Sequence, residues 1–270
     1  IIKRDTMKIK KQLLESDSEY FYEITGIENH NVNSSVGHRF WFNHLRENHS
    51  LLNGDIFEFG VYKGYSLLSI ALLLKKLGSD KKVYGFDSFS GFPEYLHQDD
   101  FSNFKKFENI AFEERLVEHA LLAKGLKQQA TTTVTPKNIS TSLNFSDTSY
   151  DQLMRKIDDF GLDNIVLIKG SFEDTVDKFF SEFEGEVFSA NIDCDLYNGY
   201  RITLPHLCNN LVTSGYIHLD EYYSLKFPGA RLAVIDYFKS IEDNNQSPQL
   251  KKNSTRDEEF ERWYVTKNMV

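Results

Sequence analysis

The chain has 270 residues, of which 40% are hydrophobic and 14% aromatic, enough to bury the core of one globular domain. Its formal net charge of -9 at pH 7 argues against a broad nucleic-acid-binding surface. No apolar run approaches the roughly 18 to 20 residues of a membrane span. From the charge we expect no nucleic-acid partner, and from the lack of such a run no membrane partner. Two cysteines, Cys194 and Cys208, are too few for a disulfide framework, which favours the reducing cytoplasm.

The first 54 residues predict a helical region that packs on the core and on the substrate side. Residues 3–24 are expected to be helical and partly exposed. The stretch "SVGHRFWFNHLRENHS", residues 35–50, predicts a helix that turns Phe40, Trp41 and Leu45 inward. The segment that follows, from residue 55 to residue 270, is predicted to form the main domain.

Within that domain, apolar segments of strand length alternate with segments of helical period, which predicts an α/β fold with helices on both faces of a sheet. Leucines recur at helical spacing after the first strand, and Gly78 is expected to end that helix. The predicted strands are Asp55–Phe59, Lys82–Asp87, Asn164–Lys169, Val187–Asp193, Tyr216–Asp220 and Arg262–Thr266.

The segment from Tyr95 to Tyr150 is too long for an ordinary connection between neighbouring elements. Its first half has helical period, and its second half is polar and poor in core-forming residues. We therefore expect a helical insertion followed by a loop. Such an excursion near the carboxyl ends of the strands can serve as a substrate lid, although a purely decorative surface insertion fits the pattern equally well.

A glycine turn follows the first strand, in "DIFEFGVYKGYSLLS", residues 55–69. Gly60 and Gly64 between a strand and a helix allow a ligand to approach backbone N–H groups and the helix start. The pattern is neither a phosphate-binding loop nor a dinucleotide fingerprint, because Tyr62 occupies the place of the middle glycine. Glu58 would repel a pyrophosphate but attract an ammonium group, such as that of S-adenosylmethionine.

A second feature points to a nucleoside ligand. The second strand ends in "VYGFDSFSGFPE", which places Asp87 where an acid can accept hydrogen bonds from both hydroxyls of a ribose. Taken alone, Asp87 could equally be a solvated turn acid or a helix cap. Together with the glycine turn it favours a nucleoside-type ligand.

Acidic residues gather at the ends of two later strands, in "ANIDCDLYNGY" and "GYIHLDEYYS". Asp193 and Asp195 lie two apart at a predicted strand end and are expected to project to the same side. Asp220 and Glu221 close the next strand. If the strands are neighbours, the crowded carboxylates need a cation, and Mg²⁺ suits oxygen ligands best. The alternative is that these acids are separate loop residues facing water.

These motifs, with "IKGSFEDTV" and "PGARLAVIDYF", occur in the order seen in the macrocin O-methyltransferase (TylF-like) family, which the chain resembles over about Val36–Phe238. Members of that family are class I S-adenosylmethionine-dependent enzymes. The resemblance implies a Rossmann-like sheet of seven mostly parallel strands. It also implies Mg²⁺-assisted methylation of a hydroxyl on a small molecule, often on a sugar of a natural product.

The resemblance also assigns roles to residues. Asp193, Asp220 and Glu221 match the metal positions, and Asp195 matches the general base, so Asp193 and Asp195 are the expected catalytic residues. The family usually has Asp-Asp where this chain has Asp220-Glu221. The residues expected around the cofactor are Glu58, Gly60, Val61, Tyr62, Gly64, Ser66, Asp87, Ser88, Gly170, Ser171, Phe172 and Asp193.

Several alternatives remain open at this level. His97 or His119 of the insertion could act as the base in place of Asp195. A nicotinamide-dependent reductase and a noncatalytic S-adenosylmethionine-binding module are the rival functions, and the first tolerates no dense acidic metal cluster. The acceptor could be a sugar, phenolic or polyketide hydroxyl. Aromatic segments outside the sheet are compatible with a homodimer.

Overall fold

The computed structural model describes residues 37–107, 135–140, 142–224, 226–241, 247–253 and 262–268. The predicted helix over residues 3–24, most of the predicted helical insertion and His119 lie outside these ranges. The described strands form one sheet with the order β3-β2-β1-β4-β5-β7-β6. Their bounds are β1 Asp55–Phe59, β2 Val83–Asp87, β3 Ile165–Lys169, β4 Val187–Ile192, β5 Leu211–Leu219, β6 Gln249–Lys252 and β7 Trp263–Thr266.

The sheet is mixed, with a parallel body and an antiparallel margin. The first five strands pair in parallel, whereas β7 runs antiparallel to both β5 and β6. All six predicted strands are confirmed, with ends shifted by a few residues. The strand β6, "QLKK", was not predicted, because four residues with two lysines at a sheet edge carry little apolar signal.

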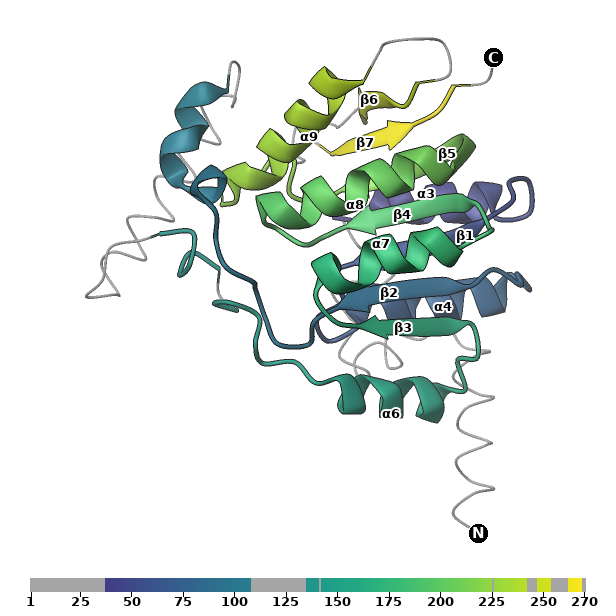
Figure 1. Ribbon diagram of the computed structural model, residues 1–270. Helices are drawn as coiled ribbons and strands as arrows, with labels where there is room; N and C mark the ends of the chain where they lie inside the picture. The colour runs from purple at the N-terminus through teal and green to yellow at the C-terminus, as the bar shows by residue number, and fades with distance from the viewer. Residues whose placement is uncertain are drawn as a thin grey trace.

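Helices cover both faces of the sheet, as Figure 1 shows, with α7, α8 and α9 in front and α3 and α4 behind. This arrangement confirms the predicted fold class. Phe57 and Phe59 of β1 face the front core, while Ile56 faces the core beneath α3 and α4. The described helices are α3 Arg39–Asn48, α4 Tyr65–Lys76, α6 Tyr150–Phe160, α7 Phe172–Glu182, α8 Tyr197–Asn210 and α9 Pro228–Ser240.

The helix α3 attaches the chain before the sheet to its rear face. Trp41 and Leu45 are fully buried, as predicted, but Phe40 is only partly buried, and Phe42 fills the deep position instead. The indole Nε1 of Trp41 donates a hydrogen bond of 2.8 Å to Ser189 Oγ on β4. Ser189 Oγ in turn donates to the Tyr216 carbonyl at 2.7 Å, so one buried hydroxyl joins α3 to β4 and β5.

Replacing Ser189 with Ala should destabilise the protein by about 1–3 kcal/mol, because the buried Trp41 N–H loses its acceptor. Urea unfolding of the wild type and the variant would measure this difference in the free energy of unfolding. Ser181→Ala is the matched control, since the Ser181 hydroxyl makes only an exposed bond to the Lys178 carbonyl. Equal stabilities for the two variants would contradict a structural role for the Ser189 hydroxyl.

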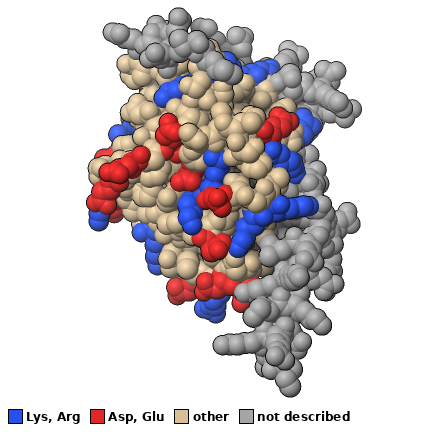
Figure 2. All heavy atoms as spheres, turned by 90° about the vertical axis from the view of Figure 1, so that its right-hand side faces the viewer, with Lys and Arg blue, Asp and Glu red and all other residues tan. Residues whose placement is uncertain are grey.

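The two ends of the parallel strands differ in character. Figure 2 shows the side of the molecule where these strands begin, and acidic and basic side chains are interspersed on it. Lys75 pairs with Asp163 there at 2.8 Å. The opposite edge, where the parallel strands end, gathers the predicted site residues. Among the described helices, none has the length and apolar character needed to cross a bilayer.

The described parts of the 95–150 insertion begin with two short 3₁₀ helices, His97–Asp99 and Phe101–Lys106. The buried carboxylate of Asp99 accepts hydrogen bonds from Leu96 N at 3.0 Å and Tyr197 N at 2.8 Å. These bonds fix the start of the insertion against the beginning of α8. A lid function for the insertion stays a prediction.

Candidate active site

A cavity of about 470 Å³ lies at the carboxyl edge of the sheet, between the turns that follow β1, β2, β3 and β4. Such a crevice is where open α/β sheets bind their ligands. Ten of the twelve residues expected around the cofactor line it. These ten are Gly60, Val61, Tyr62, Ser66, Asp87, Ser88, Gly170, Ser171, Phe172 and Asp193.

The turn after β1 is held in shape by two close contacts. Gly60 has a φ of +92°, and a Cβ added to it would lie 1.9 Å from the carbonyl oxygen of Asp193. Asp87 Oδ2 accepts hydrogen bonds from Val61 N and Tyr62 N, both at 2.8 Å. Asp87 Oδ1 accepts another from Phe89 N at 2.6 Å. Asp87 therefore organises the turn itself, and its remaining lone pairs can accept hydroxyl groups of a ligand.

Glu58 lies in the sheet behind this turn rather than on the cavity wall. It is fully buried, and its Oε1 accepts hydrogen bonds from Ser66 Oγ and, at 3.2 Å, from Asn191 Nδ2. Its Oε2 has no hydrogen-bond partner. Burial, with a smaller contribution from the charge of Asp87, raises the pKa of Glu58 to about 7 despite the two hydrogen bonds.

Gly64 is the other expected cofactor residue that does not line the cavity. It precedes α4 with a φ of +82°, and a Cβ there would come within 2.4 Å of Leu153 Cδ1 on α6. The structure thus gives Gly64 a packing role between two helices, which the sequence pattern could not separate from a ligand role.

Several lining residues were missed by sequence reasoning. They sit next to predicted positions or on a distant loop, and among them are Tyr65, Phe92, Phe145, Glu173, Leu196 and Asn198. Phe145 could not be found from local sequence, because it comes from the polar second half of the insertion. Its ring lies edge-on to Tyr62, with 5.2 Å between the ring centroids.

The loop around Phe145 is tied to the glycine turn by a second set of contacts. Asp147 accepts hydrogen bonds from the Tyr62 hydroxyl at 2.8 Å and from Lys63 Nζ at 2.6 Å. Thr148 Oγ1 also donates to the carbonyl of Tyr62. Phe145 therefore lines the cavity although it is far from the glycine turn in sequence, and the neighbouring Asp147 and Thr148 hold its loop against that turn.

Three carboxylates meet beside the cavity. Asp193, Asp195 and Glu221 each offer a carboxylate oxygen within 4.8 Å of the others. Asp193 and Asp195 were expected to face the same side because they alternate along a strand, but β4 already ends at Ile192. The two residues lie instead in a sharp turn, in which Asp195 has a φ of +61°. Burial raises the pKa values of all three acids, and nearby charges add to it: chiefly Asp220 for Asp193 and for Glu221, and Glu221 for Asp195.

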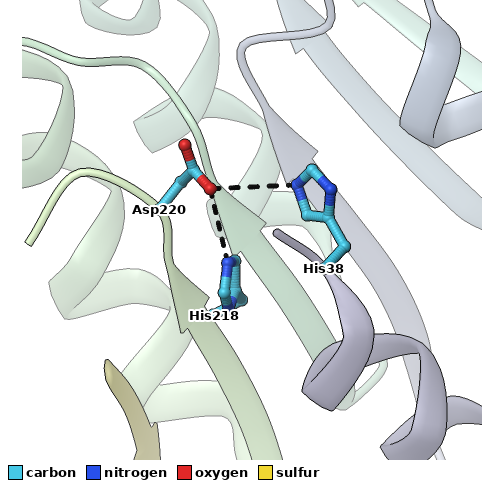
Figure 3. Close-up of side chains that lie close together, drawn as sticks. All are labelled: His38, His218 and Asp220. Carbon is cyan, nitrogen blue, oxygen red and sulfur yellow. Dashed lines mark ion pairs between the residues drawn. The ribbon is translucent and has the colours of Figure 1, made fainter. Parts of the chain in front are cut away.

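Asp220 turns toward two histidines instead, as Figure 3 shows. Its Oδ1 lies 3.5 Å from Nε2 of His218 and 4.0 Å from Nε2 of His38. Burial disfavours the charged form of Asp220, but the contact with His218 and the charge of His38 outweigh it and hold the pKa of Asp220 below its usual value. Burial also lowers the pKa of His218, so its ring is neutral at neutral pH.

Of the two histidines considered as alternative bases, only His97 lies within the described residues. His97 is exposed on a 3₁₀ helix and does not line the cavity, whereas His38 and His218 were not singled out. His218 belongs to a buried polar row across the sheet, in which Glu58 pairs in register with Asn191 and Asn191 with His218. A polar residue in an otherwise apolar strand, "GYIHLDE", was the signal available in the sequence.

Comparisons with known proteins agree with this geometry. The family model described as macrocin-O-methyltransferase (TylF) matches residues 44–135 and 127–248. The solved structure of the O-methyltransferase NovP is 19% identical, with a TM-score of 0.55, over 91% of this chain and 81% of that one. The calicheamicin methyltransferase CalS11 is 17% identical, with a TM-score of 0.60, over 97% of this chain and 91% of that one.

At these identities the two solved structures show a shared fold, while the family follows from the sequence model. No curated protein sequence matches the chain. The matched ranges run through the glycine turn, the acids at the strand ends and α9. The chain therefore belongs to the macrocin-O-methyltransferase (TylF) family and is an S-adenosylmethionine-dependent O-methyltransferase.

Proposed function

We propose that the protein methylates a hydroxyl of a small molecule, a sugar or another natural-product intermediate, with the help of Mg²⁺. One observation carries this proposal: Asp193 and Asp195 belong both to the wall of the cavity and to the group of three converging acids. A methyl donor in the cavity and a cation at the acids would then lie next to each other, on either side of Asp193 and Asp195. Methyl transfer needs such proximity of donor and acceptor.

The cavity fits S-adenosylmethionine. Glu58 lies just behind the lining residue Ser66, and its buried Oε2 lacks a partner, so an ammonium group at that part of the wall would be the charge it can pair with. Gly60 leaves room where any Cβ would collide. Asp87 would accept the ribose hydroxyls, and the Gly170–Phe172 stretch would border the adenine. When bound, S-adenosylmethionine supplies an electrophilic methyl group.

The acids fit a hard divalent cation. The pKa values of the partly buried Asp193 and Glu221 are raised by desolvation and then chiefly by the charge of Asp220, and a cation would offset this repulsion. Oxygen donors are the ligands that Mg²⁺ prefers. We assign Asp193, Asp220 and Glu221 as its ligands. When bound, Mg²⁺ supplies positive charge that orients the acceptor hydroxyl and lowers its pKa.

The remaining step is removal of the hydroxyl proton, which we assign to Asp195. Its carboxylate borders the cavity and is not among the assigned ligands, so it can accept the proton that the hydroxyl loses on methylation. Asp193 would hold the cation next to the transferred methyl. The left-handed backbone at Asp195 directs its side chain back toward Asp193 and Glu221, which keeps the base beside the acceptor.

The acceptor class rests on similarity. CalS11 is described as a TDP-rhamnose 3'-O-methyltransferase, so sugar hydroxyls are the first class to test here. Calorimetric titration with S-adenosylmethionine and S-adenosylhomocysteine comes first, with NADPH as the control nucleotide. Transfer of a labelled methyl group to nucleotide-linked sugars, free sugars and phenols would follow, with Mg²⁺ or with EDTA.

Micromolar binding of both sulfur compounds and EDTA-sensitive transfer would support the proposal. Binding of NADPH alone would favour the reductase. Binding of S-adenosylmethionine without transfer to any acceptor class would favour the noncatalytic module. Transfer that is unaffected by EDTA would contradict the assigned role of Mg²⁺.

The titration of Glu58 gives a pH-dependent prediction for stability. Its pKa of about 7 in the fold exceeds the value of 4.5 expected when unfolded. The stability contributed by the protonated acid is therefore fully present below pH 4.5 and lost as pH rises through 7, a change of about 3 kcal/mol. Urea unfolding of the ligand-free protein between pH 5 and pH 8, beside Glu58→Gln, would measure the part due to this residue.

The same group should make cofactor binding depend on pH in the opposite direction. An ammonium group next to Glu58 favours the carboxylate, so S-adenosylhomocysteine affinity should rise about tenfold from about pH 6 to pH 8 with release of a proton. Calorimetry in two buffers of different ionisation enthalpy would count that proton. In Glu58→Gln the affinity should be weaker and free of this pH dependence; an unchanged pH profile would contradict the assignment.

A further inference from the structure

Two histidines and a carboxylate converge between α3 and the end of β5. Figure 3 shows one ring nitrogen of His38 and one of His218 directed at the same oxygen of Asp220, while the second oxygen points away from both rings. The separations from Asp220 Oδ1 are 3.5 Å to His218 Nε2 and 4.0 Å to His38 Nε2. Each residue offers a donor atom within 4.8 Å of the other two.

These separations suit a shared cation better than hydrogen bonds. An N–H···O bond spans about 2.7–3.2 Å, which is shorter than either distance here. Two donors on a tetrahedral ion with bonds of about 2.0–2.1 Å lie roughly 3.3 Å apart. Side-chain movements of less than about 1 Å would thus bring all three donors into bonding distance of one ion.

Both ring nitrogens of His218 lack a hydrogen-bond partner although the ring is deeply buried. The residue is fully inaccessible to solvent. Leaving such a buried polar group unsatisfied is unfavourable. A cation on Nε2, the nitrogen that faces Asp220, would satisfy one of the two.

The other ring nitrogen has a matching acceptor nearby. Asn191 pairs in register with His218 across β4 and β5, and its amide oxygen also lacks a partner. An ion on Nε2 would fix the proton on Nδ1, from which it could be donated to Asn191 Oδ1. Metal-binding histidines commonly have such a supporting hydrogen bond.

Aromatic packing holds both rings in place. The His218 ring lies nearly parallel to Trp41, at an interplanar angle of 3° and a centroid distance of 6.3 Å. The His38 ring lies 5.5 Å from that of Phe42. Rings fixed in this way lose little freedom when they bind an ion.

We propose that His38, His218 and Asp220 bind a divalent first-row transition ion, such as Co²⁺ or Zn²⁺. Two imidazole nitrogens and one carboxylate favour these ions, whereas Mg²⁺ prefers oxygen ligands alone. This site goes beyond the proposed function. Asp220 Oδ1 serves it, and the second oxygen of the same carboxylate remains for the magnesium assigned to the acid group.

Cobalt titration of the chelator-treated full chain tests the site directly. We expect one Co²⁺ per chain with visible d–d absorption, imidazole scattering at the cobalt X-ray absorption edge, and displacement by Zn²⁺ but not by excess Mg²⁺. His38→Gln and His218→Gln should each weaken Co²⁺ binding by more than about tenfold. Circular dichroism of each variant would establish that it is folded.

Two matched variants separate this site from its surroundings. His206→Gln removes a partly exposed histidine that pairs with Asp177, and it should leave Co²⁺ affinity unchanged. Asp193→Asn removes a proposed magnesium ligand, and it should keep the imidazole-ligated Co²⁺. These assays measure Co²⁺ binding and not methyl transfer. Absence of Co²⁺ binding would leave Mg²⁺-dependent methyl transfer intact as a proposal, and absence of methyl transfer would leave the Co²⁺ site intact.

Three results would overturn the proposal. One is Co²⁺ binding that survives both histidine substitutions, and another is equal loss of binding in His206→Gln. The third is an X-ray absorption spectrum of the Co²⁺-loaded wild type without imidazole scattering. This measurement is sufficient by itself if neither histidine variant folds.

Discussion

Asp193→Asn should reduce methyl transfer by more than about 10³-fold while S-adenosylhomocysteine affinity stays within about tenfold. A catalytic cation supplies several kcal/mol of transition-state stabilisation, and each 1.4 kcal/mol is about tenfold in rate. Asparagine keeps the shape of the side chain but removes the charge that would hold the cation. Steady-state kinetics on an identified acceptor, beside calorimetry with S-adenosylhomocysteine, would measure both quantities.

The stability of this variant distinguishes loss of chemistry from loss of structure. Burial and the charges of Asp220 and Asp195 raise the pKa of Asp193, so neutralising it removes repulsion from the ligand-free protein. Asp193→Asn should therefore be at least as stable as the wild type. Asp163→Asn, at an exposed carboxylate paired with Lys75, is the charge-matched control and should retain activity. Persistent turnover in Asp193→Asn would mean that the cation assignment is wrong.

Gly60→Ala should abolish cofactor binding and destabilise the fold together. The new Cβ would lie 1.9 Å from the Asp193 carbonyl oxygen and 2.7 Å from its carbonyl carbon, so the backbone of one of the two turns must move. We expect a loss of more than about 3 kcal/mol in the free energy of unfolding and more than about 100-fold in S-adenosylhomocysteine affinity. Urea unfolding and calorimetry would measure these losses.

Gly78→Ala separates crowding from backbone strain. Gly78 also has a positive φ, +66°, but an added Cβ would meet nothing within 4 Å. The substitution should cost about 1–2 kcal/mol and leave cofactor affinity unchanged. Similar affinity losses in the two variants would show that contact between the turns after β1 and β4 does not shape the cavity.

The sheet and most of the residues that line the cavity could be predicted because their signals are local. Buried parallel strands are short apolar runs, and the turn after β1 carries its glycines and its acid within a few residues. The acid at the end of β2 was also visible in the sequence. Its three backbone hydrogen bonds were not, since they depend on how the turns after β1 and β2 meet.

The surroundings of the acids could not be predicted in the same way. Asp220 was expected to face the other acids, and the sequence did not show that one of its oxygens also faces His38, which comes from before the sheet, and His218. Asp195 reaches its neighbours through a left-handed residue, a conformation that no local pattern of aspartates indicates. Both features depend on contacts between segments far apart in the chain.

The contacts of Asp147 bear on how fast the enzyme can exchange spent cofactor for fresh. The Lys63–Asp147 pair and its contact with the Tyr62 hydroxyl lie on the surface, where solvent and salt screen such interactions so that they contribute little to stability. The loop that carries the lining residue Phe145 is therefore held by contacts that water and salt readily break. Departure of S-adenosylhomocysteine should speed up with ionic strength, so the pace of repeated turnovers depends on the salt around the enzyme.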